Sequence, residues 1–282
     1  MINHLHYIPR DLKDALEFLN THDAYIMAGG TDLMVQKHRS SGLLPTLERD
    51  TLYIMGLKEL DYIRVDAEKN VHIGAVTRYC ELLESSLIPE PIKEVIREIA
   101  SPNIRNMATL VGNIANASPA GDTLVPLNLY DASIVLSSKQ GNRTILVSDF
   151  IQGYRKTDHH VNELITEVII PYLDLNITYK KVGSRKAETI TKVSFMGGYK
   201  IEGGMIKDLR IAFGSVSVKV VRSKEIEQKY QKISVNELRA RVDDIVNEYD
   251  WIVTPITDQR STKEYRKKVA FNLLRAFLKN IK

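Results

Sequence analysis

Apolar residues recur along the chain with two different periods, and each period indicates one kind of element. The stretch "DLKDALEFLN" (residues 11–20) spaces its apolar side chains as an amphipathic helix does. Short apolar runs typical of buried strands occur at 24–28, 52–56 and 163–171. Polar turns between alternating runs predict two hairpins, with their turns at 67–70 and 139–142. The first part of the chain is therefore expected to mix helices with strands.

The pattern changes after Pro171. Long alternating stretches predict antiparallel strands, and Glu202-Gly203-Gly204 has the composition of a tight turn between two of them. Helical spacing then returns at about 222–231, 234–248 and 261–280. We place a boundary near residue 175, which gives an α+β domain over 1–175 (in two parts, about 1–57 and 58–175) and a second α+β domain over 176–282.

Composition narrows the class of protein. Hydrophobic residues make up 44% of the 282 residues and charged residues 26%, as in ordinary soluble globular proteins. The net charge of +4 is too small for this length to predict nucleic-acid binding. Cys80 is the only cysteine, which excludes a disulfide within the chain and an iron–sulfur cluster ligated by this chain alone.

No stretch of the sequence predicts a membrane segment. The N-terminus lacks the apolar core of a signal peptide, and no apolar run approaches the roughly 18 residues that a membrane-spanning helix needs. The basic stretch "RKKVAFNLLRAFLKN" (266–280) favours a docked helix with a solvated face, with an anionic partner or membrane surface as the alternative. We expect a cytoplasmic protein that binds neither membrane nor nucleic acid.

A glycine turn interrupts the first apolar run. In "AYIMAGGTDLMVQ" (24–36) the run stops at Gly29-Gly30-Thr31-Asp32, and a helical pattern follows at once. The turn matches neither the G-x-G-x-x-G pattern nor the Walker A loop. Adjacent glycines nevertheless leave backbone N–H groups unshielded, and a helix start favours an anion. The alternative is a plain turn in which Thr31 or Asp32 caps the helix.

A segment rich in small and amide side chains follows at 103–132. It includes "TLVGNIANASPAGD" (109–122), where small residues let a ligand approach the backbone and amides offer hydrogen bonds. Asp122 either accepts from a sugar hydroxyl or caps the next helix. A hydrogen-bonded network internal to the protein would also satisfy these polar groups.

Four stretches together resemble the FAD-binding medium subunit of the molybdenum hydroxylases, as in xanthine, carbon monoxide and nicotinate dehydrogenases. They are "AGGTDL" (28–33), "IRNMATLVGNIANASPAGD" (104–122), "FIQGYRKTDHHVNELITEVIIPY" (150–172) and "KKVGSRKAETITKVSF" (180–195). The resemblance implies an α+β fold. A two-part vanillyl-alcohol-oxidase-type (PCMH-type) FAD-binding domain should precede a C-terminal domain that has a three-stranded antiparallel sheet and helices.

The resemblance also assigns residues to FAD. The glycine turn should wrap the pyrophosphate, Asp122 should meet a sugar hydroxyl, Ile165 should lie against a ring, and Lys181 should be the cation near the flavin. A valine at 111 departs from the glycine that is common there, which puts the geometry of that turn in doubt. The implied cofactor-binding residues are Met27, Ala28, Gly29, Gly30, Thr31, Asp32, Leu33, Thr109, Gly112, Asn113, Asp122, Ile165 and Lys181.

On this resemblance the chain transfers electrons and hydroxylates nothing itself. A large subunit with the molybdenum cofactor would oxidise the substrate, and a small subunit would carry electrons through [2Fe-2S] clusters to FAD, which reduces NAD+ or another acceptor. We expect xanthine or another purine as the substrate of the complex, with nicotinate or carbon monoxide as alternatives. No catalytic side chain and no metal site are assigned to this chain. A non-catalytic scaffold and a free-standing flavin oxidase remain as other possibilities.

Overall fold

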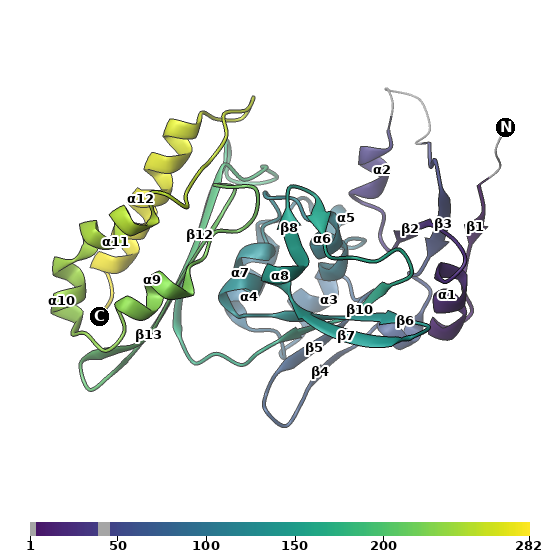
Figure 1. Ribbon diagram of the computed structural model, residues 1–282, viewed down its shortest axis with the longest axis horizontal. Coiled ribbons are helices and arrows are strands. Elements are labelled where there is room, and N and C mark those ends of the chain that lie inside the picture. Colours follow the sequence, from purple (N-terminus) through teal and green to yellow (C-terminus); the bar gives the residue numbers. More distant parts are fainter. Residues whose placement is uncertain (1–3, 39–45) are drawn as a thin grey trace.

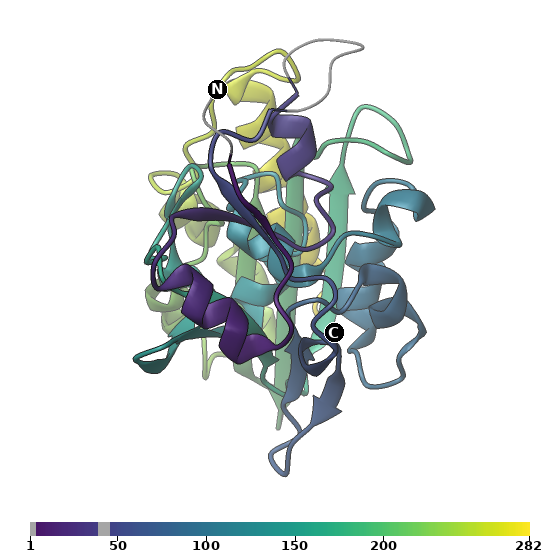
Figure 2. The same cartoon turned by 90° about the vertical axis from the view of Figure 1, so that its right-hand side faces the viewer.

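The chain forms three consecutive layers of structure along its longest axis. In the computed structural model, which describes residues 4–38 and 46–282, an N-terminal sheet, a central sheet with helices and a C-terminal sheet with helices follow one another (Figure 1). Figure 2 views the chain from the N-terminal end, with the other two layers behind it. The mixed α+β class predicted from the sequence is therefore confirmed.

The N-terminal layer is a small parallel sheet in the order β1-β3-β2. Helix α1 begins where the sequence predicts, and the Asp11 carboxylate caps it by accepting from the Asp14 backbone N–H at 2.8 Å. The strand predicted at 52–56 begins two residues earlier. The elements are β1 (His6–Tyr7), α1 (Leu12–Leu19), β2 (Ala24–Met27), α2 (Leu33–Gln36) and β3 (Asp50–Tyr53).

The central layer is an antiparallel sheet in the order β4-β5-β10-β6-β7, with helices packed against it. Both predicted hairpins are present. The strands of the sheet are β4 (Ile63–Val65), β5 (Val71–Gly74), β6 (Ser133–Ser138), β7 (Gly141–Leu146) and β10 (Leu164–Ile170). The shorter elements are η1 (Lys58–Leu60), α8 (Val147–Phe150), β8 (Ile151–Gly153) and β9 (Lys156–Thr157).

The segment 103–132 holds three short helices, although its sequence offers a helix only as one alternative, after Asp122. Every residue of the last helix, α7, is buried, and Thr123 rather than Asp122 occupies its N-cap position. A helix that is buried all round shows no alternation of apolar and polar positions. The helices of this layer are α3 (Tyr79–Glu84), α4 (Glu90–Arg97), α5 (Pro102–Arg105), α6 (Leu110–Asn116) and α7 (Leu124–Leu129).

The C-terminal layer contains the predicted three-stranded antiparallel sheet, in the order β11-β12-β13. Gly203 and Gly204 have φ of 59° and 79° and form the predicted tight turn between the last two strands. The helical stretch expected at 234–248 is broken at Arg241. The elements are β11 (Asn176–Val182), β12 (Val193–Glu202), β13 (Met205–Gly214), α9 (Lys224–Lys229), α10 (Val235–Ala240), α11 (Val242–Tyr249) and α12 (Lys263–Lys279).

This sheet buries both of its faces. Tyr179, Met196 and Ala212 join the hydrophobic core of the central layer, whereas Phe195 and Phe213 belong to a second core beneath the C-terminal helices. Since successive residues of a strand point to opposite faces, the sheet holds the two cores together.

Polar contacts add to this connection between the layers. Arg210 pairs with Asp208 at 3.2 Å, but it also donates to Asp131 of the central layer at 3.0 Å. Arg222 binds the same Asp131 carboxylate at 3.1 Å. Arg210 therefore contributes to contact between the layers and not only to a surface pair.

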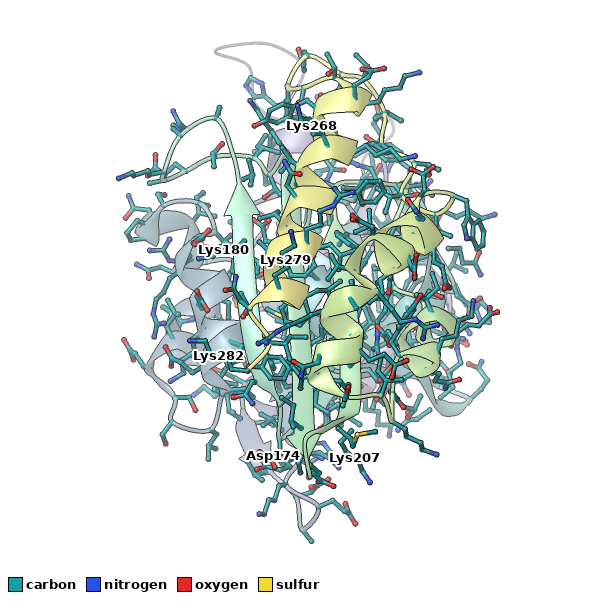
Figure 3. The ribbon with its side chains drawn as sticks, turned by 90° about the vertical axis from the view of Figure 1, so that its left-hand side faces the viewer. Asp174, Lys180, Lys207, Lys268, Lys279 and Lys282 are labelled. Carbon is teal, nitrogen blue, oxygen red and sulfur yellow. The ribbon has the colours of Figure 1, made fainter. Side chains whose placement is uncertain are left out.

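Helix α12 has the solvated basic face that its sequence favours. Lys268 and Lys279 of α12 and Lys180 of β11 lie on the outer face of the C-terminal layer (Figure 3), while Leu274 and Leu278 are fully buried. Among the described residues, none of the helices has both the length and the apolar character to cross a membrane.

Candidate functional site: a cavity between two loops

The glycine turn is held against the backbone of a second loop, residues 106–109 between α5 and α6. A Cβ atom added to Gly29 would lie 1.8 Å from the backbone oxygen of Met107, so only glycine fits at this contact. Gly30 has φ of +68°, a left-handed conformation that costs other residues about 1–2 kcal/mol. The two adjacent glycines thus have separate roles: Gly29 lets the turn approach the Met107 backbone, and Gly30 allows the left-handed backbone conformation of the turn.

Asp32 does not act as a helix cap. It occupies the N-cap position of α2 but makes no capping hydrogen bond with its side chain. Its burial raises the pKa of the carboxyl, while the charge of Arg155 and a hydrogen bond from Asn116 act in the opposite direction. Because α2 spans only residues 33–36, its dipole adds little to anion binding. The exposed backbone N–H groups of the turn are therefore its main means of binding an anion.

The second loop ends in a capped helix. Thr109 is the N-cap of α6, and its hydroxyl accepts from the Gly112 N–H at 3.0 Å. Val111, the departure from the glycine that is common there, lies inside α6 and is buried. A helical backbone accommodates valine, so the helix accounts for this residue.

Some polar side chains of the amide-rich segment form hydrogen bonds with other residues of the protein. The Thr123 hydroxyl donates to the Asn113 amide oxygen at 2.7 Å, and the Gln36 amide donates to the Asn116 oxygen at 2.7 Å. The second of these bonds joins α2 to α6 and thus connects the two loops. The internal network considered from the sequence is therefore present, and it shapes the walls between the loops.

Asp122 is the centre of a buried polar cluster. Its carboxylate accepts from the Lys181 ammonium at 2.8 Å and from the Thr191 hydroxyl. The side chains of Asp122 and Lys181 are only 9% and 3% exposed, and Lys181 also donates to the Glu98 backbone oxygen at 2.8 Å. Burial raises the pKa of Asp122 despite the opposing effect of these partners. This cluster ties β11 and the loop that precedes β12 to the central layer.

A cavity of about 1090 Å³ lies between the two loops. Its lining brings together most of the residues assigned from the sequence, although the turn and the second loop are far apart in the chain. These are Met27, Ala28, Gly29, Gly30, Thr31, Asp32, Leu33, Thr109, Gly112, Asn113 and Asp122.

Two assigned residues are not part of this lining. Ile165 is 4% exposed within β10, where its backbone pairs with Leu136. Lys181 reaches the cavity only through Asp122, whose carboxylate does line it. We therefore infer that any influence of Lys181 on a bound cofactor is transmitted by Asp122.

The C-terminal layer supplies a wall that the sequence does not indicate. Arg266 of α12 is 4% exposed and donates to the backbone oxygens of Lys192 and Ser215 and to Asp258 at 2.8 Å. It thereby fastens three segments of that wall together. Tyr154 and Arg155 line the cavity from the central layer. The wall residues come from separate loops, so no local spacing reveals them.

Trp251, the only tryptophan, does not line the cavity and is 75% exposed, so it is not a core residue. The Nε2–H of His159 donates to the Glu163 backbone oxygen at 2.8 Å, so this histidine forms a hydrogen bond within its own polar loop.

The fold and the cavity fit one class of protein, a domain that binds a dinucleotide cofactor between two loops. Residues 2–173 match the family model described as the FAD binding domain in molybdopterin dehydrogenase. Residues 178–281 match the CO dehydrogenase flavoprotein C-terminal domain. The chain therefore belongs to the family of FAD-binding subunits of molybdopterin-dependent dehydrogenases, and the resemblance seen in its sequence is confirmed.

Individual relatives agree with this family. The glyceraldehyde dehydrogenase medium chain of Sulfolobus acidocaldarius is 32% identical over 92% of this chain and 91% of its own length. The xanthine dehydrogenase FAD-binding subunit of Escherichia coli O157:H7 is 27% identical over 90% and 88%. A chain of the reconstituted CO dehydrogenase from Oligotropha carboxidovorans superposes with a TM-score of 0.87 at 25% identity, covering 98% and 97%. The chain is thus an oxidoreductase subunit of the molybdenum hydroxylase type.

Proposed function

We propose that the cavity holds FAD, with the pyrophosphate against the Gly29-Gly30 turn and the second loop. The close approach of Gly29 to Met107 carries this proposal, because it leaves the backbone of the turn bare where the two loops meet. Small side chains along both loops allow a ligand to lie against the main chain. The volume of about 1090 Å³ suits a ligand as large as a dinucleotide.

FAD, when bound, supplies the capacity to accept and pass on electrons, and the protein supplies binding, orientation and electrostatics. The turn at 28–32 and the loop around Thr109 would grip the phosphates. Asp122, held by Lys181 and Thr191, would accept from a sugar hydroxyl. The wall fastened by Arg266 would restrict the entry of water from the C-terminal side.

We further propose that this chain works as the medium subunit of a three-part complex. A large subunit with the molybdenum cofactor would oxidise the substrate, and a small subunit with [2Fe-2S] clusters would deliver electrons to FAD. NAD+ is the proposed acceptor, and the proposed location is the cytoplasm. The similarity to medium chains over nearly their whole length supports this arrangement.

The substrate of the complex is chosen by the large subunit, so the residues of this chain give little guidance. Xanthine or another purine is the proposed substrate. An aldehyde is the second candidate, because the Sulfolobus relative is named as a glyceraldehyde dehydrogenase chain. Co-expression with both partner subunits, followed by assays with xanthine, nicotinate, glyceraldehyde and carbon monoxide, distinguishes these candidates.

Replacing Gly30 by valine tests the assignment of the cofactor site. A β-branched side chain at φ of +68° is strained and would cover the bare backbone, so the variant should fold but retain little FAD. Gly56→Val is the matched control, because nothing lies within 4 Å of a Cβ at that position. Normal FAD occupancy in Gly30→Val would contradict the assignment. If the wild-type chain itself binds no FAD, the scaffold alternative is favoured.

A further inference from the structure

Arg155 stands out among the charged residues that line the cavity. It lies in the stretch "FIQGYRKT", to which the sequence assigns no site residue. Its guanidinium carbon lies 5.8 Å from the ring centre of Tyr154, and no ion pair joins it to a carboxylate within the described part of the chain. Its charge acts on the Asp32 carboxyl without forming an ion pair with it, so the guanidinium is available to an anionic ligand.

Two other cations of the lining are already paired with a carboxylate. Arg266 pairs with Asp258 at 2.8 Å, and Arg260 lies 3.6 Å from the same carboxylate. Lys37 and Arg155 form no ion pair among the described residues, and each faces a tyrosine ring instead. The position of its backbone distinguishes Arg155 from Lys37.

The backbone fixes Arg155 beside the glycine turn. Its φ is 50°, an uncommon left-handed conformation for arginine, and its N–H donates to the Ala117 oxygen at 3.2 Å. Ala117 ends α6, directly after Asn116, whose amide oxygen accepts from Gln36 of α2, the helix that follows the turn. A short chain of contacts thus connects Arg155 to the turn that is proposed to hold the pyrophosphate.

The negative charges of Asp32 and of a pyrophosphate bound at the turn would repel each other unless a cation lay beside them. Asp32 is a carboxylate in this part of the lining, and a pyrophosphate placed there would add two negative charges beside it. The turn itself, Ala28 to Leu33, contains no lysine or arginine. Backbone N–H groups alone would have to offset the repulsion, and their partial charges are smaller than a full positive charge.

We propose that Arg155 is the cationic ligand of the FAD pyrophosphate. This inference rests on the proposed function. It predicts a specific pattern of affinity: the contribution of Arg155 depends on ionic strength and requires the phosphates of the ligand. An arginine suits this role because its fork of donors matches phosphate oxygens and its charge persists at any physiological pH.

Titration of the apo chain with FAD, at low and at high ionic strength, tests the proposal. Arg155→Gln removes the charge and Arg155→Lys keeps it. Lys156→Gln is the matched control, since it removes a positive charge from the next residue, which does not line the cavity. Riboflavin, which lacks phosphate, is the second probe, and thermal unfolding checks that each variant is folded.

We expect Arg155→Gln to weaken FAD binding at least tenfold at low ionic strength, with a smaller difference at high ionic strength because salt screens the interaction. Arg155→Lys should recover part of the loss, Lys156→Gln should bind like the wild type, and riboflavin should bind all four proteins alike. Affinity of Arg155→Gln within twofold of the wild type would overturn the inference. So would an equal loss for riboflavin. Absence of FAD binding by the wild-type chain would instead reject the proposed function.

Discussion

Lys181→Met is the substitution whose effect follows most directly from the structure. Lys181 and Asp122 form an ion pair at 2.8 Å, and their side chains are 3% and 9% exposed. Methionine keeps the apolar stem of lysine but leaves the Asp122 carboxylate buried without its counter-charge. Removal of one partner from a buried pair costs about 3–5 kcal/mol. We therefore expect the free energy of unfolding to fall by about that amount near pH 8.

The loss should depend on pH, because Asp122 has another way to avoid an unpaired charge. Burial already raises its pKa, and without the ammonium the folded-state pKa would rise further. A carboxyl whose folded pKa lies above its unfolded value favours the folded state at low pH, and this contribution is lost as pH rises through the folded pKa. The deficit of Lys181→Met should thus be smaller at pH 5 than at pH 8.

Urea unfolding of the apo chain at both pH values measures the effect. Lys180→Met, on the exposed face of the same strand, is the control and should change stability by less than about 0.5 kcal/mol. The double variant Asp122→Asn with Lys181→Met should recover part of the loss, since it leaves no charge to bury. A cost below about 1 kcal/mol for Lys181→Met at pH 8, with no dependence on pH, would refute the argument.

Two further substitutions test the turn and the central sheet. Gly29→Ala places a Cβ against the Met107 oxygen, so it should lower the free energy of unfolding by about 1–3 kcal/mol and weaken FAD binding. The control Gly56→Ala should change neither quantity. Urea unfolding and FAD titration measure both, and equal stability of the two variants would contradict the contact. Partial burial of His72 lowers the pKa of its imidazole. Hydrogen bonds to the carboxylates of Glu167 and Asp66 have a larger effect and raise that pKa overall. The stability it contributes should therefore be present below its ordinary pKa and lost as pH rises through the folded value. The difference between wild type and His72→Gln, about 1–2 kcal/mol, should shrink from pH 6 to pH 9, and a constant difference would refute this.

Elements with strong periodicity could be predicted from the sequence, and those buried on all sides could not. Helix α1 has a regular apolar spacing, and the strands β12 and β13 flank the Gly203-Gly204 turn, so their positions follow from the sequence. Helix α7 is buried at every position and shows no such pattern. The break at Arg241 within 234–248 leaves the apolar spacing nearly unchanged, and for that reason the sequence suggests one helix.

The site likewise contains residues that the sequence could predict and residues that it could not. Its glycine and amide residues lie in two compact motifs, and those motifs indicated both the loops and the family. Partnerships across the fold have no such local signal: Lys181 and Thr191 reach Asp122 over 59 and 69 residues. Arg155 is exposed and follows an ordinary strand, so only the assembled cavity reveals its position.

The central claim is that this chain, alone, holds FAD between its two loops. The most direct test is to incubate the purified apo chain with FAD, remove unbound flavin by gel filtration, and determine bound flavin per chain from the absorbance spectrum. The account predicts close to one FAD for each wild-type chain and almost none for Gly30→Val, with both proteins folded by circular dichroism. A folded wild-type chain that retains no flavin, or a Gly30→Val variant that retains as much as the wild type, would contradict it.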